Sequence, residues 1–196
     1  MFRALVNEMI YTGLEGACGN QYRNGDSRNM GRTNLVLIGM PASGKSTVGV
    51  ILAKVIGYDF IDTDILIQKA EKKRLSQIIE EIGVDGFLEV ENRVNASVEA
   101  DHCVIATGGS AVYGEEAMRH FKKIGHIMYL KTDFETISRR LKNIKKRGVA
   151  LKDGQTLRDL YDERVVLYEK FADTVIEETG DAEDVVVKIL TILDKG

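Results

Sequence analysis

A glycine-rich stretch, GMPASGKST, holds the residues best suited to chemistry, because Gly39, Gly44, Lys45 and Ser46 have the spacing of a phosphate-binding loop. The glycines let backbone N–H groups turn toward phosphate oxygens, and the N-terminus of a following helix adds positive potential. The lysine would reach the β and γ phosphates, and the serine would offer Mg²⁺ a hydroxyl. We therefore predict ATP and Mg²⁺ as cofactors. The residues predicted to bind the nucleotide here are Gly39, Ala42, Ser43, Gly44, Lys45, Ser46 and Thr47.

Two carboxylates, Asp62 and Asp64, follow the next predicted strand, DFID. Side chains at i and i+2 leaving a strand point the same way, so the two groups repel each other unless they share a cation or a hydroxyl donor. Phosphoryl transfer needs such a pair, because one group lies next to the metal and the other faces the alcohol that attacks the γ phosphate. The alternative for either residue is an N-cap on the next helix.

Glycines and cations mark the later loops. Gly108 and Gly109 follow the apolar run HCVIATGG, where close approach of a ligand to the backbone is one reason for glycine and a plain tight turn is another. Seven Lys and Arg residues lie between Arg139 and Lys152. Such a run is usually a solvated face. In a protein with a phosphate-binding loop it can instead fold over the phosphates, exclude water and stabilise the transferring charge.

Arg164 lies inside the apolar stripe of a predicted helix, TLRDLYDERVVLYEKFAD. The other members of the stripe are Leu157, Leu160, Tyr161, Tyr168 and Phe171. A buried guanidinium is costly without an anion. The sequence leaves two partners open: an internal carboxylate in a structural salt bridge, or a carboxylate or phosphate of the substrate held in a fork.

Short apolar runs alternate with helical patterns from Asn34 onward. The five runs predicted as strands are NLVLIG, DFID, HCVIATGG, HIMYL and DTVIEE. Apolar residues at i, i+3, i+4 and i+7 predict helices between them, at Val48, Ile51, Leu52 and Val55 and again at Leu75, Ile78, Ile79 and Ile82. This order predicts an α/β fold with three α/β/α layers around a five-stranded parallel sheet. Ligands should bind at the carboxyl ends of the strands.

The composition limits the compartment and the partners. The chain has 196 residues, of which 44% are hydrophobic, and this suits one compact domain. Its net charge of -3 gives no basic field that would attract nucleic acid or an anionic membrane. Cys18 and Cys103 cannot form a disulfide framework, and no apolar run approaches the roughly 20 residues of a membrane span. We expect a cytoplasmic monomer that acts on a small-molecule substrate.

Residues 1–32 differ from the rest, because they are rich in Gly, Asn and Arg, show little periodicity and lack the regions of a signal peptide. Met30 stands four residues before the first predicted strand. We predict that residues 1–32 are an N-terminal extension, either a flexible segment or sequence upstream of a true start at Met30. Residues 33–196 would form the kinase domain.

Taken together, five features resemble the shikimate kinase family over about residues 34–194: GMPASGKST, IDTD, ATGGSAV, a basic KR segment and DERVVLYEKFAD. The resemblance implies a P-loop NTPase fold of the nucleoside monophosphate kinase-like type. It also implies MgATP-dependent transfer of the γ-phosphoryl group to the 3-hydroxyl of shikimate, a step of aromatic amino-acid biosynthesis. Two alternatives stay open. One is a kinase of the same fold for another small hydroxy acid or polyol, and the other is a nucleotide-binding relative without transferase activity.

The resemblance also implies roles for single residues. Lys45 and Ser46 would contact the phosphates and Mg²⁺, with Asp62 assisting the metal through water. Asp64 would bind and orient the substrate hydroxyl as the candidate base. The backbone of Gly108 and Gly109 would contact the substrate, and Arg164 would bind the substrate carboxylate. Arg140 would lie near adenine, and Arg147 would be a catalytic residue of a lid over the nucleotide.

The chain departs from the family pattern on the acid-binding side. Where the family reads Phe-Arg-x-x-Glu, this chain has Leu88 in place of the arginine, the second clamp on the substrate carboxylate. Loss of such a charge-assisted hydrogen bond costs about 1.5–3 kcal/mol, or roughly ten- to a hundredfold in substrate binding. Ser110 replaces the third glycine of a Gly-Gly-Gly motif, and Gly148 replaces the proline after the lid arginine.

A helical wheel gives a prediction for the position of Leu88 itself. The predicted apolar stripe consists of Phe87, Val90, Val94 and Val98. Leu88 is therefore expected to lie off the core face, to share a face with Glu91, and to belong to the substrate-binding region.

Overall fold

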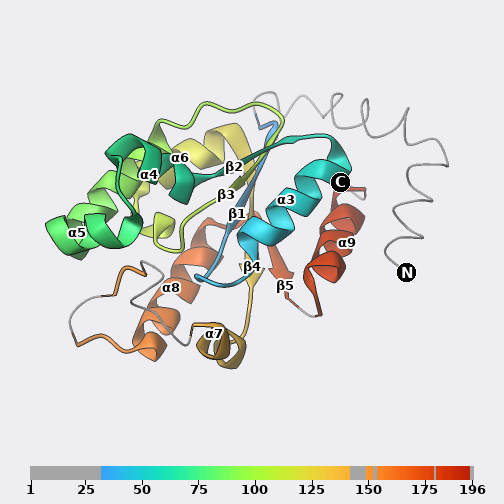
Figure 1. The fold of residues 1–196 in the computed structure, drawn as a ribbon. Coiled ribbons are helices and arrows are strands. Elements are labelled where there is room, and N and C mark those ends of the chain that lie inside the picture. The colour runs from blue at the N-terminus through green and yellow to red at the C-terminus, as the bar shows by residue number, and fades with distance from the viewer. Residues whose placement is uncertain (1–31, 142–148, 152–153, 179, 195–196) are drawn as a thin grey trace.

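The computed structural model describes residues 32–141, 149–151, 154–178 and 180–194. In this part of the chain five parallel strands form one sheet, in the order β2-β3-β1-β4-β5, with helices on both faces (Figure 1). The predicted three-layer fold with a five-stranded parallel sheet is confirmed. Apart from Arg32, the predicted N-terminal extension lies outside the described residues.

Each strand falls within or around one of the predicted apolar runs. The strands are β1 (Asn34–Ile38), β2 (Asp59–Asp62), β3 (Cys103–Ala106), β4 (Gly125–Lys131) and β5 (Thr174–Glu177). β1 is central, with Val36 opposite Ile105 of β3 and Ile127 of β4. All five of its residues are buried, because helices cover both faces of the sheet.

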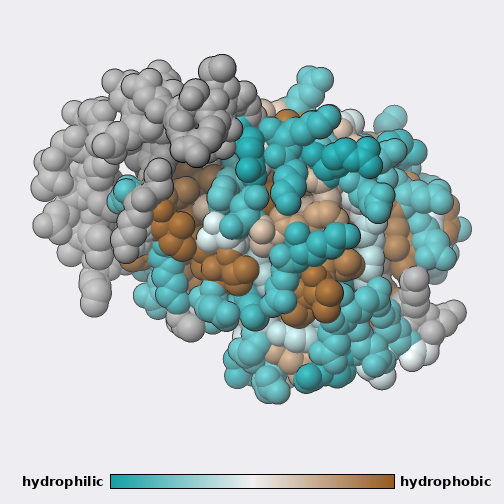
Figure 2. All heavy atoms as spheres, turned by 180° about the vertical axis from the view of Figure 1, so that it is seen from behind, coloured by the Kyte–Doolittle hydropathy of each residue, from teal (hydrophilic) through white to brown (hydrophobic). Residues whose placement is uncertain are grey.

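Helices α3 (Lys45–Ile56) and α9 (Ala182–Leu193) cover one face of the sheet (Figure 1). The other face packs against α6 (Glu115–Ile124), α7 (Phe134–Arg140), α8 (Leu157–Phe171) and a short 3-10 helix, η1 (Ala111–Tyr113). None of the helices in the described ranges combines the length and hydrophobicity that crossing a membrane requires. On the face drawn in Figure 2 the exposed apolar residues form separate areas among polar ones.

Helices α4 (Thr63–Glu71) and α5 (Leu75–Ala96) project beyond the end of the sheet and carry a cluster of their own (Figure 1). This α4–α5 cluster consists of Ile67, Ile78, Phe87, Val90 and Ala150. Gly83 interrupts α5 with φ 74° and ψ 177°, so a new helical stretch starts just before Asp85. Ile82, predicted on the apolar stripe, is 49% exposed, because the stripe ends at this kink.

The helical wheel was right that Phe87, Val90 and Val98 are buried, but it was wrong about Glu91 and Leu88. The buried face consists of Phe87, Val90, Glu91 and Asn95. Val94 is only partly buried and Val98 lies beyond the end of the helix, whereas Leu88 is half-buried against the α4–α5 cluster. A wheel assumes one covered face, but α5 is covered both by α4 and by the segment that follows β3. Glu91 therefore lies inside the protein, whereas Leu88, three residues earlier, is only partly buried.

Candidate active site

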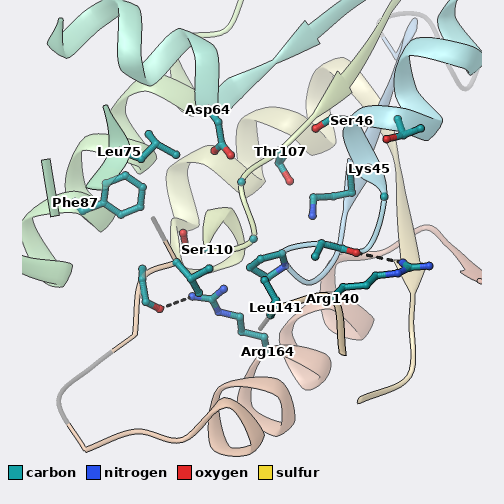
Figure 3. A pocket seen from close by; sticks show the side chains of 18 residues that line it. Lys45, Ser46, Asp64, Leu75, Phe87, Thr107, Ser110, Arg140, Leu141 and Arg164 are labelled. Carbon is teal, nitrogen blue, oxygen red and sulfur yellow. Dashed lines mark hydrogen bonds between the residues drawn. The ribbon is translucent and has the colours of Figure 1, made fainter. Parts of the chain in front are cut away.

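A cavity of about 600 Å³ opens at the carboxyl ends of the strands, where the topology of a parallel sheet places ligand sites. Its walls come from the loop between β1 and α3, the start of α4, the glycine loop after β3, and α8. Figure 3 shows Lys45, Ser46 and Arg140 on one side of the cavity and Phe87 and Ser110 on the other. The cavity thus brings together segments far apart in the sequence.

The phosphate-binding loop connects β1 to α3, as its motif predicts. Gly39 and Gly44 have φ of 146° and 89°, values that favour glycine, and a Cβ on Gly39 would lie 2.7 Å from the carbonyl oxygen of Leu130. Five of the seven residues predicted to bind the nucleotide line the cavity; these are Ala42, Gly44, Lys45, Ser46 and Thr47. Ser43 is buried beneath them. The loop therefore has the conformation that phosphate binding requires.

Lys45 is the cation of this loop. Its Nζ donates to the carbonyl oxygens of Gly39 and Met40, at 2.8 Å each. Burial lowers the pKa of Lys45 to about 8, while the nearby Asp64 carboxylate opposes that shift. The amine is thus already inside the loop, held by carbonyl groups that a phosphate oxygen can replace.

Ser46 and Asp62 fit a magnesium ion. The Ser46 hydroxyl donates to Asp62 Oδ2 at 2.8 Å, so two hard oxygen ligands meet beside the loop. Asp62 Oδ1 also accepts from the backbone N–H of Asp64 at 3.0 Å, so the predicted N-cap alternative is correct for Asp62. The described residues contain no cluster of three or more His, Cys, Asp or Glu side chains suited to a metal. Phosphate oxygens and water would have to complete the coordination shell.

Asp64 lies in the first turn of α4 and lines the cavity. Burial raises the pKa of its carboxyl to about 6, the Asp62 carboxylate adds to the rise, and Lys45 opposes it. Figure 3 places the Asp64 carboxyl between the side of Lys45 and the side of Phe87. A carboxylate with a pKa near 6 in such a place suits a group that accepts a proton from a hydroxyl.

Gly108 and Gly109 are required by packing. A Cβ on Gly108 would lie 2.2 Å from Glu91 Oε1 and 2.8 Å from Asp64 Oδ1, and one on Gly109 would lie 2.5 Å from the Pro41 ring. The segment does form a tight turn, in which the Ala111 N–H donates to the carbonyl oxygen of Gly108 at 3.4 Å, but neither glycine has a positive φ, so the turn alone does not require glycine. Gly108 thus lets the backbone approach Asp64 in the cavity wall and Glu91 behind it, and Gly109 lets the backbone approach Pro41.

We predict that Gly108→Ala lowers kcat/KM for the acceptor by at least about tenfold, because the new methyl group must displace Asp64, Glu91 or the backbone between them. Steady-state kinetics with each substrate varied in turn measure the effect. The KM for ATP serves as the internal control and should stay within about twofold, because the phosphate-binding loop is not disturbed. Unchanged kinetics would mean that the Asp64 position is not critical.

Arg164 of α8 is 1% exposed and borders the cavity. Its Nε donates to the Tyr113 hydroxyl at 3.3 Å, its Nη2 donates to the carbonyl oxygen of Ala150 at 3.0 Å, and its guanidinium lies over the Tyr113 ring. Among the described residues no carboxylate lies within ion-pair distance of it. Of the two partners that the sequence left open, an anion of the substrate fits this environment better.

Three further predicted residues have different outcomes. Arg140 lines the nucleotide side, where its Nη1 donates to the carbonyl oxygen of Ala42 at 3.2 Å and to Glu178 Oε1 at 2.8 Å. Arg147 lies outside the described residues. Leu88 is not among the residues that line the cavity, although the preceding residue, Phe87, is one of them. The structure therefore brings together the predicted donor-side residues and Asp64, Gly108, Gly109 and Arg164.

Sequence reasoning missed several residues of the acceptor side; these are Leu75, Phe87, Thr107, Ser110 and Ala150. Ser110 had a signal, because it directly follows the two glycines. It also missed that Glu91 is 1% exposed and that neither of its carboxyl oxygens has a hydrogen-bond partner of normal geometry among the described residues. Burial raises the pKa of Glu91 to about 7, although an interaction with the Ser110 hydroxyl works against the rise.

Comparison with known proteins agrees with this geometry. A family model described as shikimate kinase matches residues 41–194. A curated shikimate kinase of Clostridium botulinum (strain Loch Maree / Type A3) is 39% identical to the chain over 159 residues, which are 78% of this chain and 92% of that relative.

Solved structures give the same result. A shikimate kinase from Acinetobacter baumannii in complex with shikimate is 32% identical, with a TM-score of 0.75, and the match covers 84% of this chain and 94% of that one. The shikimate kinase of Aquifex aeolicus vf5 is 33% identical, with a TM-score of 0.70, over 82% of this chain and 96% of that one.

Proposed function

The chain belongs to the shikimate kinase family, and we propose that it transfers the γ-phosphoryl group of ATP to the 3-hydroxyl of shikimate, giving shikimate 3-phosphate. One observation carries this proposal: a single cavity holds the phosphate-binding loop, the Asp64 carboxyl and the buried Arg164. The loop can bind the phosphoryl donor, the carboxyl can accept a proton, and the arginine can bind the carboxylate of an acid. This reaction belongs to the biosynthesis of aromatic amino acids.

On the donor side, Lys45 would leave the carbonyl groups of Gly39 and Met40 and bind the β and γ phosphates. Ser46 and Asp62 would hold Mg²⁺ together with phosphate oxygens. When bound, the ion supplies positive charge that stabilises the phosphates during transfer. We place adenine near Arg140, and we assign Arg147 a position over the nucleotide.

On the acceptor side, Asp64 would accept the hydrogen bond of the 3-hydroxyl and take its proton as the new bond forms. The hydroxyl oxygen attacks the γ-phosphorus, the bond from that phosphorus to the bridging oxygen breaks, and the electron pair leaves with ADP. Arg164 would hold the acceptor carboxylate, and this contact orients the ring so that the 3-hydroxyl faces Asp64. Gly108 and Gly109, where a Cβ would collide with Asp64, Glu91 or Pro41, would offer their backbone to the acceptor.

The most direct test is an ADP-release assay with shikimate beside a panel of other hydroxy acids and polyols. We expect turnover with shikimate and much lower kcat/KM with the others. Absence of turnover with shikimate at millimolar concentration, together with turnover of another acid, would reject the proposal. ATP binding without turnover of any acceptor would indicate a nucleotide-binding protein without transferase activity. We also propose a cytoplasmic monomer, and light scattering after size-exclusion chromatography tests the oligomeric state.

The pH dependence of kcat/KM for shikimate should show a limb that falls on the acid side. Asp64 must be ionised to accept a proton, and burial raises its pKa to about 6. As the pH falls through that value the protonated, inactive fraction grows, so kcat/KM should drop about tenfold for each pH unit below it. Initial rates between about pH 5 and about pH 8 measure the profile. A profile that stays flat down to about pH 5 would contradict this role.

Leu88→Arg should lower the KM for shikimate by about tenfold, because a long arginine chain can run from this half-buried position past Phe87 toward the acceptor carboxylate. The KM for ATP should not change. Arg93 lies on the same helix as Leu88 and forms an exposed ion pair with Glu71 of α4, so Arg93→Leu offers a matched control. A KM for shikimate that is unchanged or higher in Leu88→Arg would mean that the cavity binds the acid in another way.

A further inference from the structure

We infer that Ser110 is a donor to the carboxylate of the acceptor, beside Arg164, and that the buried Glu91 orients the Ser110 hydroxyl for this contact. The inference rests on the proposed function and deepens it, because it names the residues that recognise the carboxylate of the acceptor. Ser110 would touch the acceptor directly. Glu91 would be a positioning residue, since it lies behind the cavity wall and acts through Ser110.

The first observation is the isolation of Glu91. Its side chain is buried, and neither carboxyl oxygen has a hydrogen-bond partner of normal geometry among the described residues. The groups that face it from other elements are Asp64 of α4, Arg164 of α8, Lys45 at the start of α3, and the Ser110 hydroxyl. A buried carboxyl group without a close cation is costly as an anion. Some polar group on the cavity side should therefore complete its hydrogen bonding.

The second observation concerns Ser110. It is 5% exposed and lines the cavity together with Arg164, and Figure 3 shows both on the side away from Lys45 and Ser46. The other buried hydroxyl in the cavity wall, on Thr107, already donates to the carbonyl oxygen of Leu37 at 3.0 Å. The Ser110 hydroxyl lies near enough to Glu91 to lower the pKa of that carboxyl. It is thus placed between a buried carboxyl group and the space that an acceptor would fill.

The third observation is how Arg164 uses its donors. Tyr113 and Ala150 accept from Nε and Nη2, so only the remaining N–H groups can serve a ligand. A carboxylate can accept about four hydrogen bonds, and Leu88 cannot supply one. The acid therefore has room for a donor besides Arg164. Ser110 is the buried hydroxyl in the described wall that can be this donor.

Direction matters in this chain of hydrogen bonds. Neutral Glu91 donates its proton to Ser110 Oγ, which leaves the Ser110 hydrogen free to point at the acceptor carboxylate. Ionised Glu91 would accept that hydrogen itself and would place a second negative charge near the acid. Burial and Asp64 favour the neutral form, whereas Ser110, Arg164 and Lys45 favour the charged one, and the balance is a pKa of about 7. Acceptor binding should therefore weaken as the pH rises through this range.

Ser110→Ala and Ser110→Gly test the contact. We expect each to raise the KM for shikimate by about tenfold or more while kcat and the KM for ATP change little. With the methyl ester of shikimate, which has no carboxylate, the parent and both variants should show the same KM. Ser76→Ala, at an exposed position of α5, is the matched control. An unchanged KM for shikimate, or an equal rise with the ester, would overturn the inference.

Glu91→Gln tests the positioning role. The amide is neutral at every pH and can donate permanently to Ser110, so the variant should keep the parent's low KM at about pH 6 and lose the rise of KM toward about pH 8. A variant that follows the parent's pH profile would overturn the role of Glu91. These tests are distinct from failure of the proposed function, which would appear as absent turnover of shikimate by the parent protein itself.

Discussion

Asp64→Asn is expected to lower kcat with shikimate by about 10²–10⁴-fold, because the amide cannot take the proton of the 3-hydroxyl. The side chain keeps nearly the same size and can still accept a hydrogen bond through its oxygen. Acceptor binding should therefore survive, and the KM for shikimate should change much less than kcat. Steady-state and single-turnover kinetics measure the two quantities separately.

The matched control for this variant is Asp59→Asn. Asp59 lies at the other end of β2, where it is exposed and far along the strand from the cavity. This change should leave both kcat and KM close to those of the parent. If Asp64→Asn keeps most of its kcat, Asp64 is not the base. If it instead loses ATP binding, its main role is on the nucleotide side.

Arg164→Lys is expected to raise the KM for shikimate by about a hundredfold or more, because truncating a buried, hydrogen-bonded charge partner costs about 2–5 kcal/mol. Lysine keeps the positive charge but lacks the planar fork that holds a carboxylate by two N–H groups. It would also lose the stacking on Tyr113 and the bond to Ala150. The KM for ATP should change little. Arg158→Lys is the control, because Arg158 lies on the same helix, is exposed and pairs with Asp162.

Stability separates the two roles that the sequence left open for Arg164. If Arg164 formed a structural salt bridge, removing it would lower the free energy of unfolding by about 3–5 kcal/mol. Since the described residues place no carboxylate within ion-pair distance, Arg164→Met should lose shikimate binding with a much smaller loss of stability, or with a gain. Urea denaturation of the variant and the parent measures this difference. A large loss of stability would favour the structural role.

The local sequence determined the donor half of the site. A phosphate-binding loop depends on the backbone conformation and side-chain lengths of residues close together in the sequence. A short motif can therefore predict it, as it does for Gly39, Gly44, Lys45 and Ser46. The three inner strands β1, β3 and β4 were equally readable, because strands buried on both faces are continuous apolar runs. Arg164 was also identified from sequence, since a cation inside an apolar stripe is conspicuous without any knowledge of what surrounds it.

The acceptor half depended on the tertiary structure. A helical wheel assigns one buried face to α5, but two separate surfaces cover this helix, so Glu91 is buried and Leu88 is partly buried. The meeting of Glu91, Asp64 and Ser110 around Gly108 joins three segments distant in the sequence. Whether Arg164 has an internal partner was likewise undecided until packing placed its neighbours. Periodicity and motifs report interactions between near neighbours along the chain, whereas the burial and pairing of charges depend on contacts between distant segments, which only the folded protein fixes.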